Sequence, residues 1–277
     1  MNIIYYLLRG VILAFKTGKK PIAIYQSMSK TIAIFNQAGG VGKTTLTHNL
    51  GYHLARRSHS VLLVDLDPQA SLTTFMGVDT ESLEKTPFDA LINEEPLFIL
   101  KDIKGIDLAP TNITLSVAEI QLVNLDFREV RLKESLEPIR DDYDFILIDC
   151  PPSLGLLSYT SLVAATHVLV PIETHFKAFQ GTNLLLQTIA KVRKRGNRQL
   201  QLAGFVPSRY AVSNSQDKRT LKAIQEQFGT VAPVYEPIPR TTAFADASEQ
   251  QLPLALYDPK HSALKILDEL ATQIEKL

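Results

Sequence analysis

The sequence is poor in the side chains that build disulfides and metal centres. Cys150 is the one cysteine among 277 residues, so a single chain forms neither an intramolecular disulfide nor a cysteine-rich zinc or iron–sulfur site. The six histidines show no HExxH or H-x-x-x-H spacing, which disfavours a metal site built from histidines. Charged residues make up only 21% of the chain, fewer than a disordered protein carries. The length is that of one domain, or at most two, with a buried core.

The chain also lacks an excess of either charge, because 29 Lys and Arg residues balance 29 Asp and Glu residues. This balance excludes binding to nucleic acid through overall charge, but not through a local basic surface. Residues 191–222 hold nine basic side chains and one acidic, whereas residues 81–150 hold sixteen acidic and seven basic. Residues 191–222 therefore either form a surface that holds duplex DNA through its phosphates or are solvated helix faces.

The first 29 residues are not typical of a folded domain. Residues 1–15 are apolar, but Arg9 and Gly10 interrupt them, and they are shorter than the about 20 residues of a membrane span. Basic residues follow this apolar run, whereas a signal peptide carries them before it. We interpret residues 1–29 as an N-terminal extension outside the fold, with Met28 suited to be the start of translation. A weak amphipathic contact with a membrane or a partner is the alternative interpretation.

From residue 30 to residue 277 the chain alternates short apolar runs with longer helical patterns. The predicted strands are Thr31–Phe35, Ser60–Asp65, Ile106–Pro110, Asp144–Asp149, His167–Ile172 and Gln201–Pro207. The predicted helices are Thr44–Arg57, Ser116–Leu136, Leu154–Ala165, Ala178–Lys194, Ser215–Phe228 and Ser262–Lys276. This alternation predicts a single α/β domain over 30–277, with a mostly parallel, doubly wound sheet and helices on both faces. Ligands bind at the carboxyl ends of the strands in such sheets.

A glycine-rich loop follows the first predicted strand and leads into a helix. It reads Ala38-Gly39-Gly40-Val41-Gly42-Lys43-Thr44-Thr45, and three glycines within four positions let the backbone direct its N–H groups at a phosphate. The helix N-terminus adds partial positive charge, Lys43 reaches the terminal phosphates, and the Thr44 hydroxyl is a ligand for Mg²⁺. The strict G-x-x-x-x-G-K-[ST] pattern fails, because Gln37 stands where its first glycine belongs.

These residues resemble the ParA/MinD group of P-loop ATPases, whose deviant Walker A motif reads K-G-G-x-G-K-[ST]. The resemblance continues through 61–69 (VLLVDLDPQ) and 145–152 (FILIDCPP), and weakly into 238–240 (IPR), so it covers nearly all of 31–277. It implies a P-loop NTPase fold, a cytoplasmic ATPase that uses ATP and Mg²⁺, and a homodimer that forms on ATP binding. It also implies the nucleotide-binding residues Gly39, Gly40, Val41, Gly42, Lys43, Thr44, Thr45 and Pro239.

Three carboxylates end predicted strands and are expected close to the phosphate loop. Asp65 and Asp67 end the strand Ser60–Asp65, which we expect beside that loop, and Asp149 ends another strand. By resemblance, Asp67 and Lys43 are catalytic, with Asp67 activating the attacking water. Asp149 holds Mg²⁺ together with Thr44, and Asp65 supports the metal region. The alternative is that these residues form strand-terminal turns or helix caps.

Members of the family carry a signature lysine at the first position of the loop, where this chain has Ala38. Alanine neither neutralises phosphate charge nor donates a side-chain hydrogen bond, so either hydrolysis is slow or another cation takes the role. We expect Lys177, in the region where the family has a switch, to be that catalytic cation; a solvated lysine at a helix start is the alternative. Within the family, loss of the lysine resembles McdA, the ATPases that position carboxysomes.

The resemblance implies a positioning ATPase whose ATP-bound dimer binds non-specific DNA of the nucleoid and whose adaptor protein stimulates hydrolysis. Carboxysomes are the expected cargo, and plasmid or chromosome partition is the alternative. The expected DNA-binding residues are Arg193, Lys194, Arg195, Arg198, Lys218, Arg219, Lys222 and Arg240. A metabolic P-loop enzyme, such as an amidoligase, is a further alternative that requires a small substrate.

A membrane-cycling ATPase of the MinD kind is the second alternative. It requires a C-terminal helix with a basic polar face, whereas residues 262–277 carry two basic and three acidic side chains. This balance predicts that the helix packs on the domain and that the protein does not bind membranes.

Overall fold

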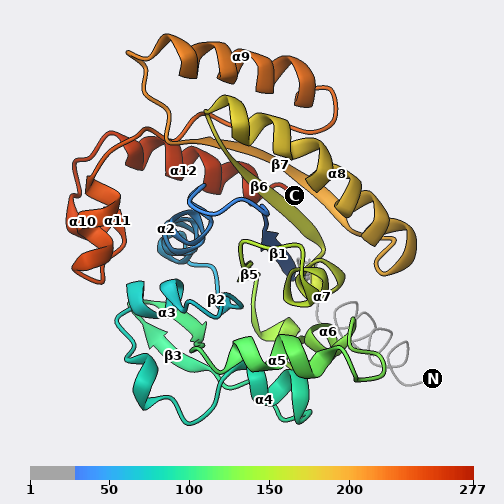
Figure 1. The fold of residues 1–277 in the computed structure, drawn as a ribbon. Helices are drawn as coiled ribbons and strands as arrows, with labels where there is room; N and C mark the ends of the chain where they lie inside the picture. Colours follow the sequence, from blue (N-terminus) through green and yellow to red (C-terminus); the bar gives the residue numbers. More distant parts are fainter. Residues whose placement is uncertain (1–28) are drawn as a thin grey trace, which may run out of the picture.

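The computed structural model describes residues 29–277, apart from the side chains of residues 176–180. The predicted N-terminal extension, residues 1–29, lies outside the described residues except for Ser29. The described chain is built around one seven-stranded sheet with helices on both faces (Figure 1). Its strands are β1 (Lys30–Ile34), β2 (Val61–Asp65), β3 (Leu100–Ile103), β4 (Ile106–Ala109), β5 (Phe145–Asp149), β6 (His167–Glu173) and β7 (Gln201–Ser208).

The strand order is β3-β4-β2-β5-β1-β6-β7. Every neighbouring pair is parallel except β3 and β4, so the prediction of a mostly parallel, doubly wound sheet is confirmed. One expectation was wrong in detail, because β2 does not lie beside β1 and its phosphate loop. Strand β5 lies between them and pairs with both.

The helices alternate with the strands along the chain. They are α2 (Lys43–Arg56), α3 (Ser71–Phe75), α4 (Pro87–Ile92), α5 (Leu115–Leu122), α6 (Arg131–Leu136), α7 (Leu156–Ala164), α8 (Phe176–Arg195), α9 (Ser215–Phe228), α10 (Ala243–Glu249), α11 (Leu254–Tyr257) and α12 (Ala263–Ile274). Two short 3₁₀ helices, η1 (Thr80–Ser82) and η2 (Glu137–Asp142), complete the described elements.

Side chains of β1 alternate between two hydrophobic cores, one on each face of the sheet. Ile32 and Ile34 pack in the core that α2 and α12 cover, where Leu50 also lies. Ala33 and Phe35 pack in the core on the other face, which α7, α8 and neighbouring helices cover. All of these side chains are fully buried, which explains the apolar run at the end of β1 and at Phe35 just after it.

The predicted helix Ser116–Leu136 is wrong in its extent, because two shorter helices, α5 and α6, replace it. Between them Phe127 has φ 54°, a left-handed conformation that an α-helix does not contain. Strand β3 was not predicted. It forms a hairpin with β4 through Lys104 (φ 55°) and Gly105 (φ 83°), and left-handed conformations at both central residues are typical of a tight hairpin turn.

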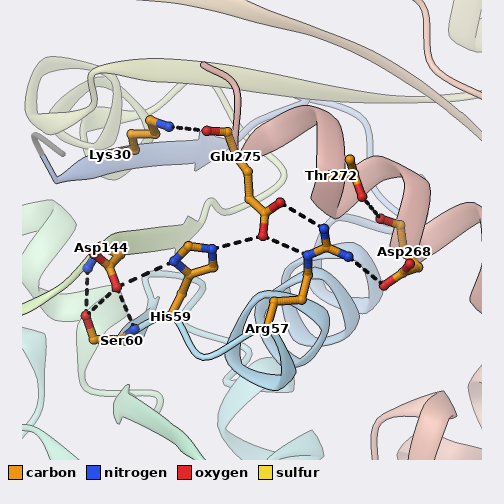
Figure 2. A network of polar contacts seen from close by, with 8 residues as sticks. All are labelled: Lys30, Arg57, His59, Ser60, Asp144, Asp268, Thr272 and Glu275. Atoms are coloured by element: carbon orange, nitrogen blue, oxygen red, sulfur yellow. Dashed lines mark hydrogen bonds and ion pairs between the residues drawn. The ribbon is translucent and has the colours of Figure 1, made fainter. Parts of the chain in front are cut away.

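The C-terminal helix α12 packs on α2 and buries Leu267, Leu270 and Ile274, which confirms the prediction that it packs on the domain. Among the described residues, none of the helices combines the length and apolarity that a membrane span requires. Figure 2 shows the polar contacts that fix the end of this helix. Glu275 accepts hydrogen bonds from Arg57 Nε (2.7 Å) and Nη2 (2.9 Å), and its Oε1 lies 2.9 Å from His59 Nε2.

We predict that Glu275→Gln lowers the free energy of unfolding by about 2 kcal/mol at pH 7, the magnitude of hydrogen bonds to a charged group. The hydrogen bond from Arg57 holds the pKa of Glu275 below its ordinary 4.5. Its stabilisation is therefore complete above pH 4.5 and is lost as the pH falls through the depressed pKa. Urea unfolding at pH 7 and below pH 4 should show the difference between the two proteins narrow on acidification.

Glu269→Gln is the matched control, because Glu269 is 52% exposed on the same helix and lies 3.8 Å from Lys265. Its loss should cost less than about 0.5 kcal/mol. Equal losses in the two variants, or a difference that is constant with pH, would contradict this role of Glu275.

Candidate active site

The loop between β1 and α2 forms the phosphate-binding geometry that the sequence predicted. Gly40 (φ 74°) and Gly42 (φ 89°) are left-handed, which glycine adopts without strain. Gly42 is the N-cap of α2, and none of the described side chains caps this helix. The first N–H groups of α2 therefore stay open to an anion at the positive end of the helix.

Neighbouring strand ends hold this loop in place. Asn36 donates from Nδ2 to the carbonyl of Pro171 (2.7 Å), and its Oδ1 accepts from the backbone N–H of Ala38 (2.9 Å). Ser208, at the end of β7, donates to the carbonyl of Val41 (2.8 Å). The side chain of Val41 is buried, so only its backbone is open to a ligand. Three strand ends thus set the shape of the loop.

Lys43 is buried at the start of α2 and directs its ammonium group back across the loop. Its Nζ donates to the carbonyl of Ala38 (3.0 Å). Burial lowers the pKa of Lys43, while the nearby carboxyl groups of Asp149 and Asp67 act in the opposite direction. The amine is therefore held at the loop by one carbonyl, and anionic phosphate oxygens are stronger acceptors for it.

Asp149 ends β5 and lies in register with Ile34 on one side and Asp65 on the other. It is fully buried, and its Oδ1 accepts from the Thr47 hydroxyl (3.3 Å). Its Oδ2 has no hydrogen-bond partner among the described residues. Burial raises the pKa of Asp149 well above its ordinary value, and the nearby charge of Asp65 adds to this rise, while the Thr44 hydroxyl opposes it.

The donor set fits a magnesium ion. A buried carboxylate oxygen without a partner is costly unless a cation or a donor reaches it. Asp149 supplies such an oxygen, and Thr44 supplies a hydroxyl beside it. The described residues contain no cluster of three or more His, Cys, Asp or Glu suited to a metal. Mg²⁺ commonly takes only one or two protein ligands, with substrate phosphates and water completing its shell.

Asp65 uses both of its carboxylate oxygens within the protein. Oδ2 accepts from the backbone N–H (2.9 Å) and the hydroxyl (2.7 Å) of Thr73 in α3, and Oδ1 accepts from the N–H of Asp67 (3.2 Å). Asp65 therefore fixes the start of the loop that carries Asp67. Neither Thr73 nor Thr47 belongs to a recognisable motif, so the sequence alone does not identify them. Asp67 itself is half-buried, and its charge acts on Lys43 and Asp149.

A cleft of about 610 Å³ opens beside the phosphate loop. Gly40, Gly42 and Thr45 form its polar side, and Pro239, predicted to bind nucleotide, also lines it. Its apolar lining comes from Leu46, Phe75, Ile238, Phe244 and Leu267. The lining thus combines backbone and polar groups of the phosphate loop with apolar side chains, a combination that suits a nucleotide with its phosphates and its base.

The basic residues predicted to bind DNA are not in one place. Arg193, Lys194 and Arg195 end α8, and Arg198 follows them, so these exposed side chains lie at the amino ends of the strands. Lys218, Arg219 and Lys222 are exposed on α9, which follows the carboxyl end of β7. We call these the α8-end group and the α9 group.

Two further predicted residues lie at or near the cleft end of the sheet. Arg240 lines the cleft instead of joining either basic group. Lys177 lies in the first turn of α8, and its side chain is outside the described residues.

Comparison with known proteins gives the family. A model of the AAA domain matches residues 29–202. Over 251 residues the chain is 36% identical to the chromosome partitioning protein ParA of Caulobacter vibrioides, covering 88% of this chain and 93% of ParA. The chain belongs to the ParA/MinD-type ATPases of the AAA domain family. This ParA/MinD-type protein is an ATP hydrolase with a P-loop NTPase fold, as the sequence predicted.

Solved structures of similar proteins have the same fold. A Mycobacterium smegmatis protein described as cobyrinic acid a,c-diamide synthase, with bound ADP and magnesium, is 35% identical with a TM-score of 0.74. That match covers 80% of this chain and 92% of the other. Apo McdA from Cyanothece is 25% identical with a TM-score of 0.79, covering 88% of this ParA/MinD-type chain and 99% of McdA.

We predict that Asp65→Asn weakens the pH dependence of stability in the nucleotide-free protein. Burial raises the pKa of Asp65 to about 7 from an ordinary 3.8. Between these values the unfolded chain loses this proton while the folded protein keeps it, so stability falls as the pH rises from 4 to 7. Urea unfolding at pH 5 and pH 7.5 should show a smaller fall in the variant.

Asp141→Asn is the control, because Asp141 is 76% exposed. The free energy of unfolding of Asp141→Asn should fall as the pH rises, to the same extent as that of the wild type. A variant at position 65 with the wild-type pH dependence would contradict the buried, protonated state of Asp65.

Proposed function

We propose that this chain is a positioning ATPase whose ATP and Mg²⁺ are held between the phosphate loop and the carboxyl ends of β2 and β5. The observation that supports this most strongly is the buried, unpartnered Oδ2 of Asp149 beside the phosphate loop. Structures of the similar Mycobacterium smegmatis protein that hold ADP or an ATP analogue with magnesium support an adenine nucleotide and Mg²⁺ as the ligands.

Each residue then has a separate task. The N–H groups of the loop and the Lys43 ammonium bind the phosphates, and the apolar side of the cleft takes the base. Thr44 and Asp149 hold the metal, and bound Mg²⁺ supplies positive charge to the phosphate oxygens. Asp67, placed by Asp65, orients and polarises the attacking water. We assign Asp65 to this orienting role, because Thr73 and Asp67 already occupy its oxygens.

We predict that Lys43→Ala and Asp149→Asn separate phosphate binding from metal binding. Lys43→Ala should weaken ATP binding at least about tenfold, since a charge-assisted hydrogen bond is lost. Asp149→Asn should bind ATP with an affinity that no longer rises when Mg²⁺ is added. Calorimetric titration of each protein with ATP, in Mg²⁺ or in EDTA, measures both effects, and a wild type without affinity for ATP–Mg²⁺ would refute the function.

The wider cycle is part of the proposal. The ATP-bound chain forms a homodimer, binds non-specific duplex DNA of the nucleoid, and hydrolyses ATP when an adaptor protein stimulates it. Ala38, in place of the family lysine, favours carboxysomes as the cargo, whereas the similarity to ParA favours chromosome or plasmid partition about equally. A membrane-cycling role is not favoured, because α12 is packed in the core and fixed by Glu275.

We predict that the two basic groups contribute separately to DNA binding. Reversing the charge of Lys218, Arg219 and Lys222 in the α9 group should weaken binding of an arbitrary duplex. It should also lower the slope of log affinity against log salt by about one for each DNA phosphate that the variant no longer neutralises. The equivalent change in the α8-end group measures its own share, and co-sedimentation at several salt concentrations gives both values.

The proposal would be contradicted if the charge reversals in the α9 group and in the α8-end group both left DNA binding unchanged. Lys133, Lys265 and Lys276, outside both groups, provide the charge-reversed control. Hydrolysis stimulated by a small acid substrate with ammonia or glutamine, and not by DNA, would favour the metabolic alternative.

A further inference from the structure

Arg209 lies beside the phosphate loop, whose first position is Ala38. It follows the last residue of β7, and its Nη1 donates to the carbonyl of Gly40 within the loop (3.1 Å). Its side chain is 54% exposed and lines the cleft together with Gly40 and Gly42. A guanidinium with five N–H donors is therefore present at the mouth of the cleft, anchored by a single neutral carbonyl on the loop.

The backbone at Arg209 is strained and held. Its φ of 55° is a left-handed conformation that a long side chain adopts only when the surrounding structure imposes it. The next residue, Tyr210, donates from its N–H to the carbonyl of Ile238 (3.0 Å), and Arg240 Nε donates to the carbonyl of Arg209 (3.3 Å). Glycine would adopt this conformation without strain, so the backbone conformation does not favour an arginine at this position.

Glu173, at the end of β6, lies between two arginines. Its Oε1 is 3.8 Å from Arg209 Nη1 and 3.9 Å from Arg240 Nη2. Both distances are longer than hydrogen bonds, and both guanidinium groups are about half exposed, so these ion pairs are weak. One carboxylate facing two guanidinium groups also leaves one positive charge in excess beside the cleft.

We propose that Arg209 leaves Glu173 and binds the phosphates of the nucleotide, supplying in the same chain the positive charge that Ala38 lacks. This proposal rests on the function proposed above. Arginine binds phosphate through two parallel hydrogen bonds, which are shorter and stronger than the loose pair with Glu173. Glu173 then keeps Arg240 as its ion-pair partner, while Arg209 pairs with the phosphates, so each of these charges still has a partner. Arg209 and Glu173 thus set the affinity for the triphosphate.

The test is a binding titration with ATP–Mg²⁺ and, in parallel, with AMP, which lacks the β- and γ-phosphates. Arg209→Gly removes the guanidinium but suits the left-handed backbone, so its melting temperature should stay at or above that of the wild type. It should bind ATP about tenfold more weakly and AMP with unchanged affinity. The ATP affinity of Arg209→Lys should lie between those of the wild type and Arg209→Gly, because lysine keeps a point charge without the paired donors.

Glu173→Gln gives a change of the opposite sign. It removes the charge that competes for Arg209, so ATP should bind severalfold more tightly, whereas a purely structural carboxylate would give equal or weaker binding. Arg140→Gln is the matched control, because Arg140 is 51% exposed and lies 3.3 Å from a neighbouring carboxylate, away from the cleft. It should leave both affinities unchanged.

The outcomes distinguish this proposal from the function on which it rests. A wild type that binds no ATP–Mg²⁺ refutes both. A wild type that binds ATP, with Arg209→Gly binding it equally well, overturns the role of Arg209 and leaves the function standing. Equal losses for ATP and AMP with a lower melting temperature show a structural role and overturn the proposal. Loss of ATP affinity in Lys177→Ala but not in Arg209→Gly assigns the cation to Lys177 and also overturns it.

Discussion

The site depends on a carboxylate that is buried with one oxygen unpaired. Asp149 lies at the centre of the sheet, where β1, β5 and β2 end together, and its side chain is fully buried there. Lys43 faces it from the loop and loses part of its own proton affinity through the same burial. Burying the Asp149 carboxylate or the Lys43 ammonium without the other would cost free energy. Even with both present, Oδ2 of Asp149 has no hydrogen-bond partner among the described residues. A cation with bound phosphates completes this arrangement, so ligand binding and local stability are linked.

Much of the fold followed from local pattern, and the failures have physical causes. β1 and β5 contain apolar runs because both faces of the sheet are covered, and this signal is visible in a short window. β3 reads LKDI and lies at the edge with its central lysine and aspartate exposed, so it carries no such signal. The break between α5 and α6 includes the left-handed Phe127, and the apolar periodicity around it conceals this change of backbone conformation.

The candidate site also contains residues that the sequence predicts and residues that it does not. Residues within one motif, from Gly39 to Thr45, come together because the chain itself connects them. The position of β5 between β1 and β2 is set by pairing over long sequence distances, and this placed Asp149, not Asp65, beside the phosphate loop. Thr73 reaches the site from another element through two hydrogen bonds to Asp65, and Arg209 does so through one to Gly40. No spacing rule identifies such residues, whereas burial and contact geometry do.

The length of α8 has a consequence for any elongated polyanion. A helix of 20 residues is about 30 Å long, and it separates the α8-end group from the region where α9 begins. B-form DNA repeats every 34–36 Å, so the same groove edge returns after a distance close to that of the helix. Under the proposed function, a duplex that contacts both groups would therefore have to extend over about the length of this helix.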